Sequence, residues 1–195
     1  MASRIVVAAV HDMANAGEPI DTAALKSAVL RANQQVLDAA AKNSAYEGMG
    51  STATVLHIDE AAQTACYAHV GDSRLYLLRG GELRRISRDH SYVEELVARG
   101  ELSEAEAQHH PRKNYLLRAV GVEERLHVDG DTFPVMAGDR FLLATDGLTN
   151  MVEDTDLCAL LGGNPDDAAR QMVERALDAG GTDNVTAIVI ACDPS

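Results

Sequence analysis

Apolar residues recur with helical spacing in an alanine-rich stretch from about Thr22 to Lys42. Positions three and four apart share one face of a helix, so this spacing predicts a long helix with one buried stripe. Asp21 or Thr22 can cap its start, and Gly48-Met49-Gly50 breaks the pattern that follows. The expected buried stripe consists of Leu25, Val29, Ala32, Val36 and Ala40.

The middle of the chain contains four consecutive apolar runs of strand length. They span residues 51–58, 63–70, 73–79 and 82–87. Their connections are short and carry turn-forming pairs such as Gly71-Asp72 and Gly80-Gly81. Because short connections join antiparallel neighbours, this succession predicts an antiparallel meander.

The remaining chain alternates between polar segments and shorter periodic runs. Residues 88–118 are polar and hold two short helical patterns, Tyr92–Arg99 and Ser103–Gln108. Further on, we expect strands at 125–135, 140–145 and 185–191 and a helix from about Asp166 to Asp178. Strands in runs with helices in separate blocks predict an α+β fold, with helices packed on antiparallel sheets. A length of 195 residues predicts a single domain, 1–195.

Composition narrows the class of partner. Hydrophobic residues make up 46% and charged residues 24% of the chain, as in ordinary globular proteins. The formal net charge of -13 argues against nucleic acid or an anionic membrane as the main partner. Three widely spaced cysteines form neither a zinc pattern nor a disulfide framework, which indicates a reducing compartment. With no membrane-length apolar run and no secretion signal, the expected location is cytoplasmic.

Three aspartates stand at the ends of apolar runs and are the candidate metal ligands. Asp72 and Asp146 each close such a run, and Asp183 opens one. Asp139, which follows Gly138, is a weaker candidate. A carboxylate at a strand end can point into a shared cleft, and hard cations such as Mg²⁺ and Mn²⁺ prefer oxygen ligands of this kind.

Each aspartate also has a structural interpretation. Asp72 fits a tight hairpin turn, Asp146 the cap of a following helix, and Asp183 a turn before a strand. Asp139 fits a turn better than a metal site. The histidine of Asp89-His90-Ser91 is expected to satisfy a backbone carbonyl rather than to transfer protons. The metal interpretation is preferred for the first three because their motifs occur together and in order.

Taken in order, these motifs resemble the PPM (type-2C) family of metal-dependent protein phosphatases in its bacterial form. The resemblance covers roughly residues 48–191 and is carried by several segments. These are Gly48–Thr52, the Val-Gly-Asp-Ser-Arg run Val70–Arg74, Asp89–Ser91 with the polar segment up to Gly121, Thr145–Leu148 and Gly181–Thr186. Each segment alone is weak evidence, whereas the ordered set is specific.

The resemblance implies a two-layered antiparallel β-sandwich flanked by helices, with a binuclear Mn²⁺ or Mg²⁺ centre at one end. It implies that Asp146, Gly147 and Asp183 bind the metals, that Asp72 serves a third metal, and that residues 88–118 form a flap. A metal-activated water would hydrolyse phosphoserine and phosphothreonine in proteins, so no protein nucleophile and no catalytic side chain is assigned. The implied partners are phosphoproteins, with a serine/threonine kinase acting on the same targets.

The chain also departs from the family pattern at its beginning. Met1–Val7 resembles the helix that directly follows the family's Asp-Gly-Met-Gly-Gly-His motif, whose aspartate bridges the two metals. The expectation is therefore an N-terminally truncated domain with weak activity. One alternative is a catalytically impaired remnant that acts as a binding or regulatory protein. Another is a different carboxylate–metal hydrolase that acts on small phosphoesters.

Overall fold

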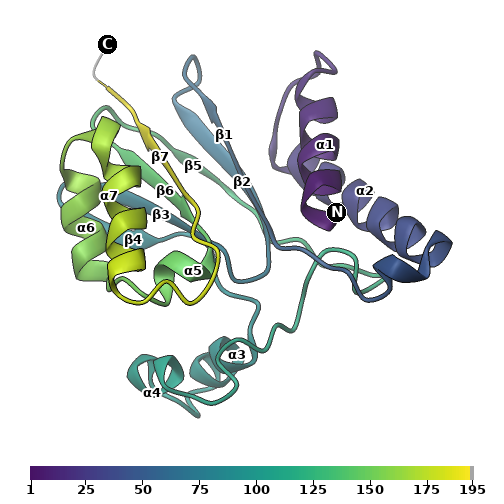
Figure 1. Ribbon diagram of the computed structural model, residues 1–195. Helices are drawn as coiled ribbons and strands as arrows, with labels where there is room; N and C mark the ends of the chain where they lie inside the picture. Colours follow the sequence, from purple (N-terminus) through teal and green to yellow (C-terminus); the bar gives the residue numbers. More distant parts are fainter. Residues whose placement is uncertain (194–195) are drawn as a thin grey trace. The chain divides into compact units, whose positions relative to one another are not determined.

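A computed structural model describes residues 1–193, which group into two compact units (Figure 1). The first unit contains Met1–Gly71 and Asp89–Pro134, and the second contains Asp72–Arg88 and the chain from Val135 onward. Each unit has its own antiparallel sheet and its own hydrophobic core. The expectation that all of this is one domain stays a prediction.

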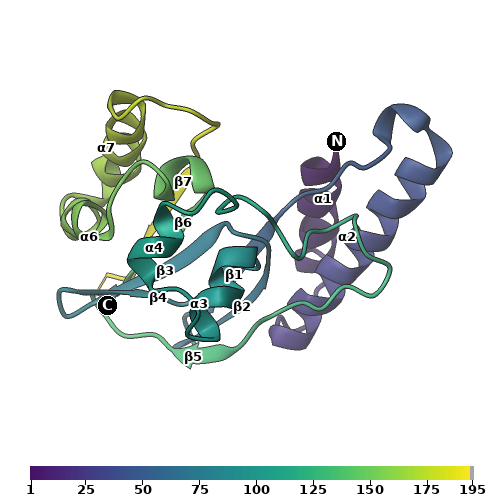
Figure 2. The same ribbon diagram turned by 90° about the horizontal axis from the view of Figure 1, so that it is seen from below.

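The first unit opens with a helical hairpin, α1 (Ala2–Ala14) and α2 (Thr22–Lys42). The two helices lie side by side (Figure 2), and α2 packs on strand β2. The bounds of α2 agree with the sequence prediction, and the Asp21 side chain caps the helix by accepting from the Ala24 amide at 2.7 Å. Most of the predicted stripe is buried, namely Leu25, Val29, Ala32 and Val36.

The first unit's sheet has three strands in the order β1-β2-β5. They are β1 (Ala53–Asp59), β2 (Thr64–Val70) and the short β5 (Thr132–Pro134), all antiparallel. A single 3-10 turn, η1 (Ser44–Tyr46), precedes β1. The strand predicted at 125–135 is thus only three residues long, because the earlier part touches β2 through one isolated bridge, His69 to Asp129.

The flap, residues 88–118, carries α3 (Tyr92–Ala98) and α4 (Glu104–Gln108). Ser103 and Glu106 form a reciprocal capping box at the start of α4. The ends of the flap pair with each other, since the Tyr92 amide donates to Tyr115 O at 2.8 Å and the Leu117 amide donates to His90 O at 2.8 Å.

The second unit is a four-stranded antiparallel sheet in the order β4-β3-β6-β7. Its strands are β3 (Arg74–Arg79), β4 (Glu82–Arg85), β6 (Arg140–Ala144) and β7 (Ala187–Ala191). Three helices belong to it: α5 (Asp146–Thr149), α6 (Asp154–Gly162) and α7 (Pro165–Asp178). In Figure 1, α6 and α7 lie side by side over this sheet. The core between them includes Tyr76, Leu142, Leu157, Leu161 and Met172.

The predicted four-strand meander is wrong. The strands exist nearly where expected, but β1 pairs with β2 and β3 pairs with β4, and β2 and β3 belong to different sheets. Gly71, with a φ of +110°, turns the chain out of the first sheet instead of closing a hairpin. Asp72 is therefore not at a hairpin turn. The helices α5 and α6 were not predicted.

Candidate functional site

The register of the second sheet brings the three candidate aspartates to one end of it. Strands β3 and β6 pair with Arg74 opposite Ala144, so Asp72 and Asp146 each lie two residues beyond that last pair. Strands β6 and β7 end with Ala144 opposite Ala187, and Asp183 lies four residues before Ala187. All three carboxylates thus lie at the same end of the sheet, where the chain enters or leaves its strands.

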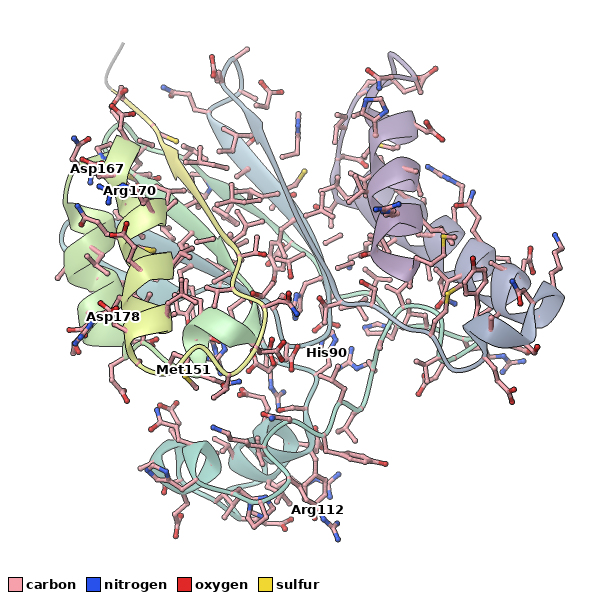
Figure 3. The ribbon with its side chains drawn as sticks, in the orientation of Figure 1. His90, Arg112, Met151, Asp167, Arg170 and Asp178 are labelled. Carbon is pink, nitrogen blue, oxygen red and sulfur yellow. The ribbon has the colours of Figure 1, made fainter. Side chains whose placement is uncertain are left out.

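The loops that carry Asp146 and Asp183 are in direct contact. The Thr186 amide donates to Thr145 Oγ1 at 3.0 Å, and Thr145 Oγ1 donates to Asn184 O at 3.3 Å. The Thr182 hydroxyl lies 3.8 Å from the sulfur of Met151, just after α5 (Figure 3). These contacts join the turn after β6 to the turn before β7.

Gly147 allows this close approach. A Cβ atom at this position would lie 2.2 Å from the backbone oxygen of Asn184, a distance that real side chains do not tolerate. Gly147 is itself buried. The structure thus gives a packing reason for glycine after Asp146, in addition to the metal role that the family resemblance implies.

The three carboxylates differ in their surroundings. Asp183 is exposed, and its Oδ1 accepts from the amide of the next residue, Asn184, at 2.6 Å. Asp146 and Asp72 are half-buried. Asp146 is the first residue of α5, whose N-cap is Thr145, so Asp146 does not act as the cap. The capping interpretation of Asp146 is therefore wrong, whereas the turn interpretation of Asp183 stays a prediction.

The side-chain groups that usually hold a metal ion in proteins combine several His, Cys, Asp or Glu residues. Among residues 1–193, no group of three or more His, Cys, Asp or Glu side chains is arranged to hold a metal ion. Carboxylate oxygens are the right donor type for Mg²⁺ or Mn²⁺.

Asp139 is a buried structural residue of the second unit. It is 1% exposed and accepts two hydrogen bonds from Arg79, at 2.8 and 2.7 Å. It also accepts from the Met136 amide at 2.8 Å and so closes a turn, as its sequence context suggested.

A polar cluster at the base of the flap, in the first unit, was missed by sequence reasoning. His90 is 3% exposed and lies on the segment before α3 (Figure 3). Its Nδ1 accepts from the Gly71 amide at 3.1 Å, and its Nε2 lies 3.1 Å from the Asp129 carboxylate. Arg118 donates to the other Asp129 oxygen at 3.0 Å. His90 was expected to satisfy a carbonyl, but its ring accepts from a backbone amide instead.

The pKa values of His90 and Asp129 are both shifted by their surroundings in this cluster. Burial lowers the pKa of His90 and so favours the neutral imidazole, although the Asp129 carboxylate opposes the shift. Burial by itself would raise the pKa of Asp129, but His90 and Arg118 outweigh it and hold that pKa below its ordinary value. Residues 90 and 129 are far apart in the sequence, so periodicity could not reveal the pair.

Comparison with known proteins identifies the family. The family model described as protein phosphatase 2C matches residues 1–187. The chain belongs to this family. The resemblance to PPM phosphatases is thereby confirmed, and so is the α+β class of antiparallel sheets flanked by helices.

The chain is similar to the serine/threonine phosphatase stp of Listeria welshimeri, with 38% identity over 168 residues. That match covers 85% of this chain and 66% of the relative, so the chain spans just under two thirds of that relative's length.

Solved structures agree with this assignment. The serine/threonine phosphatase PstP/Ppp of Mycobacterium tuberculosis superposes with a TM-score of 0.91 and 33% identity, over 99% of this chain and 82% of that one. The catalytic domain of PstP in complex with two manganese ions superposes with a TM-score of 0.87 and 33% identity, over 96% and 79% of the two chains.

No helix in the described part of the chain is long and apolar enough to cross a membrane.

Proposed function

We propose that this PP2C-family chain hydrolyses phosphoserine and phosphothreonine in proteins. The observation that carries the proposal is the gathering of Asp72, Asp146 and Asp183 at one end of a four-stranded sheet. Family membership supports it, since similar chains are serine/threonine phosphatases. No cysteine or serine nucleophile needs to be invoked for this chemistry.

The proposed cofactor is Mn²⁺ or Mg²⁺, with Asp146, Gly147 and Asp183 as ligands and Asp72 serving a third, weaker metal. The similar PstP structure with two manganese ions supports this proposal. A divalent cation, when bound, makes a water molecule nucleophilic near neutral pH and offsets phosphate charge. The chain's own contribution is to bring these carboxylates to one end of the sheet, within a few residues of its strands.

Residues 88–118 are proposed to act as the flap that meets the protein substrate. The segment from Ser103 to Gln108 is mostly exposed, as a substrate-contacting lobe requires. The proposed partners are phosphoproteins and a serine/threonine kinase with the same targets, and the proposed location is the cytoplasm. The net charge of -13 supports a partner other than nucleic acid or an anionic membrane.

The test is release of inorganic phosphate from a phosphothreonine peptide by the 195-residue chain over a Mn²⁺ series. Turnover should be slow and should rise with Mn²⁺. Asp146→Asn and Asp183→Asn should each lower it by at least about tenfold, because even residues that only support metal ligands typically cost 10–100-fold. Asp178→Asn, at the exposed end of α7 (Figure 3), is the matched control and should leave turnover unchanged.

Two results would count against the proposal. Equal activity in Asp146→Asn and Asp178→Asn would remove the metal role of the strand-end carboxylates. Binding of the phosphopeptide without turnover at any Mn²⁺ concentration would favour a binding or regulatory protein instead.

A further inference from the structure

Gly71 is the residue on which two buried histidines converge. The Gly71 amide donates to His90 Nδ1 at 3.1 Å, and the His90 amide donates to Gly71 O at 2.7 Å. His69 Nε2 donates to the same oxygen at 3.1 Å. Both histidines are buried, with exposed fractions of 0% for His69 and 3% for His90. Both backbone polar groups of Gly71 are thus satisfied inside the protein.

These bonds fix the proton on the His90 ring. Because Nδ1 accepts from an amide, the neutral imidazole carries its proton on Nε2. That nitrogen is enclosed, and it faces the Asp129 carboxylate at 3.1 Å in a contact that falls short of full hydrogen-bond geometry. Arg118 holds Asp129 in turn at 3.0 Å. The ring is therefore held at both ends.

We call the pair of hydrogen bonds between Gly71 and His90 the clamp. It lies where the chain passes from one unit to the other. The chain leaves the first unit after Gly71 and returns to it at Asp89, so the bonds between Gly71 and His90 close the base of the 72–88 segment. Only glycine fits this position without strain, since its φ is +110° and an added Cβ would lie 2.4 Å from Thr52 Cγ2. The next residue is Asp72.

We propose that His90 is a positioning residue for Asp72: it holds the Gly71 backbone from which Asp72 departs, and Asp129 with Arg118 holds the imidazole in place. The inference rests on the proposed function only in taking Asp72 to be a metal ligand. His90 touches neither substrate nor metal in this role. It ties the base of the flap to Gly71, the residue that precedes Asp72.

Two conservative variants separate the two ends of the ring. In His90→Asn, the amide oxygen stands where Nδ1 stood and can still accept from Gly71. In His90→Gln, the amide group reaches toward Asp129, but the acceptor for Gly71 is lost. Both replacements are uncharged and polar, so a general loss of charge or burial affects them alike. Asp129→Asn, which keeps the Gly71 bond but loosens the other end, should give a smaller effect.

Amide exchange measured by NMR on the 195-residue chain tests the clamp without any metal. The Gly71 amide should exchange about tenfold faster in His90→Gln than in His90→Asn, the order expected for loss of one buried hydrogen bond. Melting curves establish that the variants compared are folded. If His90→Gln does not fold, Asp129→Asn is compared with the wild type instead: the Gly71 bond remains but the ring is less firmly held, so exchange at Gly71 should be faster by less than about tenfold, and unchanged exchange would overturn the role of Asp129.

Mn²⁺-induced line broadening of the Asp72 and Ser73 amides tests the consequence for the metal. The Mn²⁺ concentration for half broadening should rise about tenfold in His90→Gln and less than about threefold in His90→Asn, with Asp72→Asn as the reference for the broadening that does not depend on Asp72. Equal Gly71 exchange in the two His90 variants would overturn the role of His90. If Mn²⁺ does not broaden the Asp72 amide signal of the wild-type chain, the proposed metal role of Asp72 is overturned instead.

Discussion

Asp139 is a buried carboxylate whose charge is balanced by a single arginine. Burial by itself would raise the pKa of Asp139, but the hydrogen bonds from Arg79 and the Met136 amide, together with the Arg79 charge, hold that pKa below its ordinary value. The carboxylate is 1% exposed, while the Arg79 side chain is 30% exposed. The pair ties β3 to the turn that precedes β6.

Replacing this carboxylate should destabilise the second unit in a pH-dependent way. Asp139→Asn should lower the free energy of unfolding at pH 7 by about 2 kcal/mol, below the 3–5 kcal/mol typical of fully buried pairs, because Arg79 is partly solvated. A depressed native pKa stabilises the fold above the unfolded carboxyl pKa of 3.8 and loses that effect as the pH falls through the native pKa.

Urea unfolding at a series of pH values checks this expectation. The difference between the wild type and Asp139→Asn should be constant from about pH 7 to 5 and should shrink below about pH 4. Asp178→Asn, an exposed control, should show no such difference. A difference that is undiminished at pH 3 would mean that shape, and not the charge of Asp139, stabilises this turn.

At the scale of elements, the contact between α5 and the turn before β7 depends on Gly147. Gly147→Ala should lower the free energy of unfolding by about 1–3 kcal/mol, the usual cost of overpacking, because its Cβ would meet the Asn184 backbone oxygen at 2.2 Å. Gly162→Ala, at the end of α6, is the matched control, since its Cβ would make only an ordinary 3.7 Å contact with Leu78.

Chemical unfolding without added metal separates the two roles suggested for this glycine. A loss of stability in Gly147→Ala, with Gly162→Ala unchanged or slightly stabilised, would support packing as the reason for the glycine. Unchanged stability combined with a loss of Mn²⁺ response would assign Gly147 to the metal site alone.

The helices whose ends depend on nearby residues could be predicted from the sequence. The bounds of α2 follow from the apolar stripe and the Asp21 cap, and α7 starts at Pro165 and ends before a glycine pair, as its sequence signals indicate. Strand existence was equally predictable. Strand partners were not, because the choice between β2 pairing with β3 or with β5 is made by tertiary packing that short connections do not encode.

The candidate site also has parts that local sequence predicts and parts that depend on tertiary packing. Asp72, Asp146 and Asp183 could be proposed because each stands beside an apolar run, and their gathering at one sheet end is then a matter of strand register. The clamp of His90 on Gly71 could not be proposed, since it joins residues 19 positions apart through a backbone amide. Such contacts depend on how the base of the flap packs, and the spacing of apolar and polar residues in the sequence does not reveal that packing.

At the scale of the whole molecule, we expect the supply of anionic metal ligands to set the level of activity. Two divalent cations close together repel each other and need anionic ligands between them. Among residues 1–193, however, no three potential ligand side chains are arranged around one ion. Asp146 and Asp183 alone supply too little negative charge to hold two cations tightly, so we expect metal binding at this pair of carboxylates to be weak.

The 195-residue chain should therefore be a poor phosphatase even at high Mn²⁺. Its turnover of a phosphothreonine peptide should be at least about tenfold below that of the full-length Listeria welshimeri relative, the minimum expected when ligation of a catalytic metal is impaired. Half activation should also need more Mn²⁺, because fewer carboxylates compete with water for the ion. Phosphate release measured side by side over a Mn²⁺ series checks both expectations. Equal turnover and equal Mn²⁺ dependence would show that the strand-end carboxylates recruit the remaining donors from within this chain.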